Sequence, residues 1–248
     1  GTTAVLNALK TADAPTVAQA GIYTAHCLHL DVTTADAAIS AGDVFVIRQN
    51  IEGLNAASFG FGQTGTRYVT LSFWHKHTKT GTYCVSLRNS ATDRSYVAEY
   101  TQDVTDTWEQ ATVTIAVDTS GTWLYDTGIG LSVSFALAGG STFQTTANTW
   151  AAGNFLATAN QVNALDSTAN NFKIALVQLE AGSVATPFET RPYGTELALC
   201  QRYLPAFIGY GTDAVGMGLI ASATAGNAVF AFPVTSRIPP TGITVSNV

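Results

Sequence analysis

The chain has 248 residues, only 11% of them charged, and its 17 acidic and 11 basic side chains give a formal net charge of −6. Because attraction to phosphate groups dominates nucleic-acid binding, an acidic chain with scattered lysines and arginines argues against DNA or RNA as a partner. No apolar run approaches the roughly 20 residues that a membrane-spanning helix needs, so we expect no membrane insertion. With so few charges the surface is largely neutral and rich in hydroxyl groups, which suits sugars or contacts between copies of the chain.

The first 22 residues show little periodicity, and strand-like runs follow them. Each run alternates apolar with polar residues or is continuously apolar, and polar turns separate neighbouring runs at the spacing of antiparallel strands. We therefore predict an all-β, antiparallel jelly-roll β-sandwich over residues 1–190, belonging to a longer parent protein because the chain starts without a methionine. The predicted strands are residues 23–32, 42–49, 68–77, 82–88, 96–101, 111–117, 131–137 and 171–179.

Residues 131–137 show the clearest alternation of this series. Leu131, Val133 and Phe135 fall on one face of the predicted strand, and Ser132 and Ser134 fall on the other. Because successive side chains of a strand point to opposite sides, this pattern predicts an apolar face turned to the core and a hydroxyl face turned outward.

Residues 138–170 are rich in Gly, Ser, Thr and Asn and have no strong period, while Phe143, Trp150 and Phe155 are isolated apolar anchors. A loop of that length inside a compact domain is a candidate for function. A second loop, residues 121–130, carries Trp123 and Tyr125.

Three cysteines, Cys27, Cys84 and Cys200, form an odd set without the spacing of a metal site. The pattern fits thiols kept reduced in a cytoplasm, so we expect no structural disulfide. His75 and His77 lie two residues apart and so share one strand face, where packing and hydrogen bonding are favoured over metal ligation. They would become ligands only if another strand or subunit completed the shell, and we expect neither a metal site nor a cofactor.

The predicted sandwich ends at a turn over residues 180–182, and Pro187, Pro192 and Gly194 then redirect the chain. Thr195 is a predicted N-cap, and apolar residues follow it at helical spacing. We predict a helical hinge over residues 191–205 and the start of a second β-rich unit over residues 206–248. Its predicted strands are residues 217–223, 228–234 and 244–248.

The sequence also resembles a known family of proteins. QLEAGSVATPFETRPYGTELALCQRYL, residues 178–204, closely resembles a segment near the end of a β-sandwich domain in many bacteriophage tail-fibre and other virion-associated proteins. The resemblance runs in order from about residue 31 to residue 204, and a match of several motifs is more specific than any one of them. The other motifs are QNIEG (49–53), VTLSFWHKH (69–77), GTYCVSLRNS (81–90), RSYVAEY (94–100), TWEQATVTI (107–115) and GTWLYDTGIGL (121–131).

This resemblance implies a jelly-roll fold similar to carbohydrate-binding modules and a non-enzymatic role in a phage virion, in a tail fibre or receptor-binding protein that recognises host-surface glycans. It implies synthesis in the bacterial cytoplasm, contacts with other virion proteins, and a homo-oligomer, with a trimer as first choice. The alternatives are a decoration or adaptor protein with a purely structural role and, less favoured, a glycan depolymerase. No nucleophile elbow, triad signature or separated pair of carboxylates supports an enzyme.

Aromatic side chains are the stronger lead to a ligand, because Trp and Tyr faces stack on sugar rings while amides and hydroxyls bond sugar hydroxyl groups. Trp74 and Trp108 lie on or beside predicted strands, where packing is favoured. Trp123 and Trp150 lie in loops, where pinning the loop and stacking on a ligand are equally open roles. The predicted glycan site consists of Trp123, Tyr125, Trp150 and Asn154, from the two loops. Phe155, Thr127, Asn148 and Gln161 are its predicted neighbours.

Overall fold

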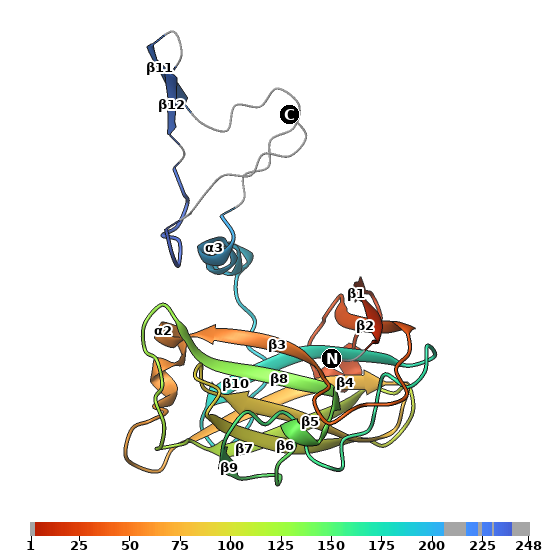
Figure 1. The fold of residues 1–248 in the computed structure, drawn as a ribbon. Coiled ribbons are helices and arrows are strands. Elements are labelled where there is room, and N and C mark those ends of the chain that lie inside the picture. The colour runs from red at the N-terminus through yellow and green to blue at the C-terminus, as the bar shows by residue number, and fades with distance from the viewer. Residues whose placement is uncertain (1–2, 206–216, 223–224, 230, 240–248) are drawn as a thin grey trace. The chain divides into compact units, whose positions relative to one another are not determined.

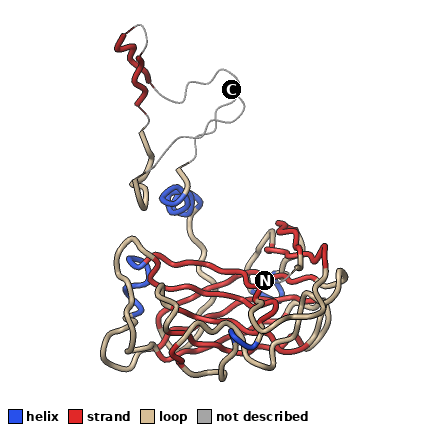
Figure 2. Tube along the Cα trace, in the orientation of Figure 1, coloured by secondary structure: helices blue, strands red, loops and turns tan. Residues whose placement is uncertain are grey.

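The structure is a computed structural model that describes residues 3–205, 217–222, 225–229 and 231–239. The chain divides into two units, Gly1–Phe188 and Glu189–Val248. The first unit consists mostly of strands, as predicted, and its helices are short (Figure 2). None of the helices in the described ranges is both long and apolar enough to cross a bilayer.

The first unit is a sandwich of two five-stranded antiparallel sheets, which confirms the predicted fold class (Figure 1). Sheet A has the strand order β1-β2-β10-β4-β7 and sheet B has the order β3-β8-β5-β6-β9. The strands of sheet A are β1 (Val5–Thr11), β2 (Cys27–Thr34), β4 (Tyr68–His77), β7 (Glu109–Ala116) and β10 (Asn171–Ala181). Those of sheet B are β3 (Val44–Glu52), β5 (Gly81–Arg88), β6 (Arg94–Gln102), β8 (Ile129–Gly139) and β9 (Trp150–Ala152).

The alternation read from residues 131–137 sets the core as predicted. Leu131, Val133 and Phe135 of β8 lie in the main hydrophobic cluster, with Leu71 and Phe73 of β4 on the facing sheet. Burial of large apolar side chains from both inner faces is the dominant favourable contribution to such a sandwich.

Two strands lie where the sequence showed no strand period. Strand β1 pairs antiparallel with β2 at the edge of sheet A, and β9 pairs with β6 at the edge of sheet B. Short helices α1 (Val17–Ala20), α2 (Gly53–Ala56), η1 (Ala57–Phe59) and η2 (Ser141–Phe143) occupy connections. The segment 138–170 is consequently not one open loop, because it contains the end of β8, η2 and β9.

A buried polar group stands among the aromatic side chains of the core. The Gln102 side-chain oxygen accepts hydrogen bonds from the His77 backbone N–H at 2.9 Å and from His75 Nδ1 at 3.0 Å. The Gln102 amide nitrogen donates to the carbonyls of Val104 and Thr107, each at 2.8 Å. The two histidines therefore pack and bond within the core, in line with the role that the sequence favoured for them.

The second unit contains helix α3 (Tyr193–Tyr203) and the hairpin of β11 (Met217–Ser222) and β12 (Ala225–Val229). The helix begins three residues before the predicted start, with Pro192 and not Thr195 at the N-cap. The reason for this correction lies in the backbone: the Pro192 carbonyl accepts hydrogen bonds from the N–H groups of Thr195 at 2.9 Å and Glu196 at 3.2 Å, and so closes the first turn. The predicted hinge role stays a prediction, and the expected strand at 244–248 lies outside the described residues.

Acid should destabilise the sandwich through its buried histidines. Burial lowers the pKa of His75, and lowers that of His77 well below its usual value. Below a pH of about 6.5 these histidines bind protons in the unfolded chain but stay neutral in the folded one. The free energy of unfolding therefore has its full value above that pH and falls as the pH drops below it.

We therefore expect the free energy of unfolding to fall between pH 7 and pH 5 by up to about 1.4 kcal/mol per pH unit for each such histidine. Urea denaturation across this range measures the slope. His77→Phe, which keeps a ring against Phe172, should reduce the slope, whereas the same change at exposed His26 serves as the control. Equal slopes in His77→Phe and the parent would contradict this explanation.

Candidate functional site

The structure brings two of the predicted glycan-binding residues together, but inside the molecule. The rings of Trp123 and Trp150 meet edge to face at 5.6 Å, and Trp123 also stacks on Phe61 at 4.4 Å. The Trp123 indole N–H donates to the carbonyl of Ser120, and that of Trp150 donates to the carbonyl of Ala116. Trp123 is only 7% exposed. Within the fold, its indole N–H has a hydrogen-bond acceptor and its ring has aromatic contacts, so both parts of the side chain are satisfied.

The stacking platform predicted at Trp123 is thus corrected to a core position, and Trp150 is half-buried beside it. Sequence could not distinguish the two roles, because an aromatic residue that pins a loop and one that binds a ligand give the same pattern.

Tyr125 keeps part of its surface free. Its ring is 37% exposed, and its hydroxyl group donates to the carbonyl of Phe61 and accepts from Gln63 Nε2 at 3.3 Å. The hydroxyl is therefore occupied, and the exposed ring is what Tyr125 offers to a ligand.

Asn154 lies apart from this aromatic cluster. Its side-chain oxygen accepts a hydrogen bond from Arg88 Nη1 on β5, although Asn154 itself is exposed. Gln161, a predicted neighbour, accepts from the Cys84 backbone N–H at 2.7 Å and donates to the carbonyl of Val162. The predicted site is consequently divided, and its amides serve largely to hold the segment 153–162 in place.

That segment covers the side of sheet B that faces away from the core, called here the outer face of sheet B. Outward-pointing residues stand opposite one another in rows across β3, β8, β5 and β6. One row is Asn50, Ser132, Arg88 and Ser95; the next is Arg48, Ser134, Ser86 and Val97; the third is Val46, Ala136, Cys84 and Glu99.

Small side chains in these rows allow the covering segment to approach closely. Ala157 packs on Cys84 and Ala136, and an added Cβ at Gly139 would lie 2.7 Å from the Ala157 side chain. Thr158 and Asn160 both donate to the Glu99 carboxylate. The segment predicted as an open loop is therefore a packed cover over one end of these rows.

Two arginines on the outer face of sheet B, Arg48 and Arg88, are called here the arginine pair. Arg88 is 2% exposed, and its Nε atom is buried without a hydrogen-bond partner. Burial, and then the charge of Arg48, lower the pKa of Arg88 to about 10, so Arg88 stays cationic at neutral pH. No carboxylate of the described residues forms an ion pair with either arginine.

Polar neutral groups surround the arginine pair. Arg48 is exposed and donates from Nε to the Ser134 hydroxyl at 3.1 Å. The Ser132 hydroxyl donates to the exposed Asn50 side chain at 2.7 Å. The Ser86 hydroxyl is fully buried and without a partner.

The arginine pair is linked to the loop that carries Trp123 and Tyr125. Asn89, which directly follows Arg88, donates from its side chain to the carbonyl of Thr122 at 3.1 Å. The loop 121–130 therefore meets sheet B at the end of β5 where Arg88 stands, and the arginine pair is the strongest candidate site in the first unit.

Sequence analysis did not single out this pair. A signal was present, since Cys84, Ser86 and Arg88 alternate with apolar residues and so share one strand face. The pairing of β5 with β8, which places that face beside Ser132 and Ser134, is a tertiary fact.

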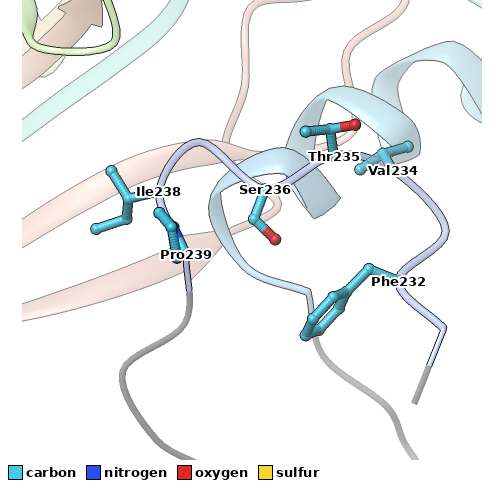
Figure 3. Close-up of a pocket in the computed structure, with 6 residues that line it drawn as sticks. All are labelled: Phe232, Val234, Thr235, Ser236, Ile238 and Pro239. Atoms are coloured by element: carbon cyan, nitrogen blue, oxygen red, sulfur yellow. The ribbon is translucent and has the colours of Figure 1, made fainter. Parts of the chain in front are cut away.

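The second unit contains a shallow apolar hollow beside helix α3 (Figure 3). The helix and the segment 232–239 are joined by hydrogen bonds from Arg202 Nη1 to the Thr235 carbonyl and from the Arg237 N–H to the Arg202 carbonyl. Arg202 of α3 borders the hollow on its helix side. The described residues contain no cluster of three potential metal ligands. The lining residues are Phe232, Val234, Thr235, Ser236, Ile238 and Pro239.

No protein-family model and no curated protein matches the chain. Among solved structures, it is similar to the enzymatically active domain of tailspike protein 4 of Bacteriophage CBA120, with 14% identity and a TM-score of 0.38 over 73% of this chain. The chain spans only 18% of that tailspike's length.

It is also similar to a structure described as "CBM4 structure and function", with 9% identity and a TM-score of 0.37, covering 73% of this chain and 79% of that one. A Family 16 carbohydrate-binding module is similar at 11% identity and a TM-score of 0.28, over 65% of this chain and 80% of that one. At TM-scores below 0.5, none of these similarities assigns a role to a residue of this chain.

Because Trp123 belongs to the core, Trp123→Ala should act on stability. We expect the free energy of unfolding to fall by about 3–5 kcal/mol, as for other large-to-small changes in cores. Denaturant unfolding followed by far-UV circular dichroism measures this loss. Tyr23→Ala, at a fully solvated tyrosine, is the control and should change stability by less than about 0.5 kcal/mol. A Trp123→Ala variant as stable as the parent would show that the ring is not part of the core.

Proposed function

We propose that this chain is a non-catalytic component of a bacteriophage virion, in a tail fibre or receptor-binding protein, that binds saccharides of the host surface through the outer face of sheet B. The observation that carries the proposal is the arginine pair with its surround of hydroxyl and amide groups. The family resemblance of residues 31–204 supports the phage assignment, with synthesis in the host cytoplasm and final location on the virion.

The chemistry of this face suits sugars. Guanidinium groups donate hydrogen bonds to sugar hydroxyl groups, and amide groups both donate to them and accept from them. Arg48, Asn50 and Asn154 are exposed there, and the Tyr125 ring offers an apolar surface on the adjoining loop. One stacked sugar contributes about 1–3 kcal/mol by analogy with bases stacked on aromatic side chains, so each site is expected to bind weakly.

Binding without catalysis is supported by how the carboxylate of this face is used. Glu99 accepts hydrogen bonds from Thr158 and Asn160, so it fixes the covering segment. Hydrolysis of a glycosidic bond ordinarily requires two carboxylates that flank the bond, one as acid and one as base or nucleophile.

Weak single sites call for several copies, and a homotrimer within a larger assembly of virion proteins would provide them. The low charge content supports contacts between copies. In the second unit, helix α3 has no buried residue, with Tyr193 81% exposed and Leu197 also exposed. A helix of 11 residues gains most of its stability from packing, so this surface is suited to a contact with another copy.

Saccharide binding should be lost in part when exposed groups of the face are removed. We expect the parent chain, presented at high density on beads, to retain host polysaccharide, and Asn50→Ala and Tyr125→Ala each to reduce retention several-fold without loss of fold. Tyr23→Ala is the matched control.

Other outcomes point to other functions. New reducing ends in the polysaccharide would identify a depolymerase. No retention of any saccharide, together with incorporation into particles, would favour the decoration or adaptor role and would contradict the proposal.

The oligomeric state can be tested separately. We expect light scattering at micromolar concentration to give three times the monomer mass, and Leu197→Ser with Tyr193→Ser to shift the population towards monomer, because both remove apolar surface from α3. A parent chain that is monomeric under these conditions would contradict a trimer built by this segment. Val104→Ser, at an exposed position of the first unit, controls for a general effect of polarity.

A further inference from the structure

We infer that the arginine pair is a subsite for an oxyanion, so that the saccharide recognised by this chain carries carboxylate, sulfate or phosphate groups. This inference rests on the proposed function and specifies the class of its ligand. The net charge of −6 taken by itself would instead favour a neutral saccharide, because like charges repel.

The first argument is the contrast between Arg88 and three other buried or partly buried cations of the same unit. Lys173 has the Asp13 carboxylate at 2.7 Å, Lys79 is bonded to Asp166, and Arg94 has Asp118 at 2.6 Å. Each of these cations is compensated by an acid. Arg88 is more deeply buried than any of them, and its cationic neighbour is Arg48.

An uncompensated buried charge is costly. Removing a charged group from water costs several kcal/mol unless a counter-charge and hydrogen bonds offset it. Asn154 supplies one neutral acceptor to Arg88, and Ser134 supplies one to Arg48. Arg48 and Arg88 lie on one face with only neutral hydrogen-bond acceptors. A bound anion would supply the negative charge that the protein does not.

The second argument is the presence of unused donors. The Nε atom of Arg88 and the hydroxyl of Ser86 are both buried without a partner, and they stand on adjacent rows of the outer face. Buried polar groups normally have partners, so two exceptions beside an uncompensated cation indicate a place for a ligand.

The geometry of guanidinium groups points to oxyanions in particular. A guanidinium binds carboxylate, sulfate or phosphate through two parallel hydrogen bonds, and such charge-assisted bonds are about twice as strong as neutral ones. An oxyanion would therefore compete well with the neutral Asn154 oxygen for the edge of Arg88. Exposed Arg48 gives the ligand its access from solvent, and exposed Asn50 can bond a sugar hydroxyl beside it.

The experiment compares binding of three polymers to the full chain by biolayer interferometry at low salt: polygalacturonate, dextran sulfate and neutral dextran. We expect both polyanions to bind at least about tenfold more tightly than dextran. Added sodium chloride should weaken binding of the polyanions and leave binding of dextran unchanged, because salt screens charges. Arg48→Gln should reduce polyanion binding about tenfold but dextran binding much less, because the glutamine amide still bonds sugar hydroxyl groups; polyanion binding by Arg48→Lys should lie between Arg48→Gln and the parent.

Arg48 is the informative position because it is exposed and its loss leaves the buried Arg88 in place. The control is Arg67→Gln, which removes the same charge from an exposed arginine before β4. It should leave all three affinities unchanged, so that a general charge effect is distinguished from a local one.

The inference is overturned if dextran binds as tightly as the polyanions or if Arg48→Gln equals the parent, even when the proposed saccharide binding itself stands. It is also overturned if inorganic sulfate alone binds as tightly as one repeating unit of the polymers, since the sugar would then contribute nothing. Absence of binding to any of the three polymers, in a chain that retains host polysaccharide, would likewise contradict it.

Discussion

Burial of sheet B on both of its faces is the constraint on which the rest of the first unit depends. Its inner face supplies Leu131, Val133 and Phe135 to the core, while its outer face is covered by the chain's own segment 153–162. When an irregular segment covers one face of a sheet, the buried N–H and C=O groups of that segment need hydrogen-bond partners. The small residues of the middle strands and the amides of the cover meet this requirement together.

This constraint explains where chemistry remains available. The cover uses Glu99, Gln161 and the Cys84 sulfur and backbone as bonding partners, so they are closed to ligands. The ends of these rows that lie on β3 are less completely covered, and there the exposed Arg48 and Asn50 reach solvent. The candidate site is the part of the outer face that the protein's own chain does not fill.

Buried polar groups of the sandwich differ in how fully they are hydrogen-bonded. In the core, Gln102 uses both ends of its amide to satisfy four partners, and the two histidines beside it are neutral because burial lowers their pKa. On the outer face, Arg88 keeps its charge, has a neutral partner in Asn154, and has one donor atom left over. A fully satisfied group indicates a structural role, whereas an unsatisfied charged group indicates a place for a ligand.

The sequence by itself determined the strands of the sandwich. The alternation of Leu131, Val133 and Phe135 with serines determines which face of β8 turns to the core, because a strand's side chains have a strict period of two. The weakly patterned β1 and β9 were missed, since short edge strands gain their pairing from the neighbouring strand more than from their own composition.

Only the tertiary structure decided the candidate site. Trp123 and Tyr125 lie two residues apart, and yet one is core and the other partly exposed, because the position of Phe61 determines which ring is covered. Arg48 and Arg88 are 40 positions apart in the sequence and become neighbours through the strand that pairs between them, β8. Local periodicity records which way a residue faces, but it carries no information about what long-range pairing places opposite that residue.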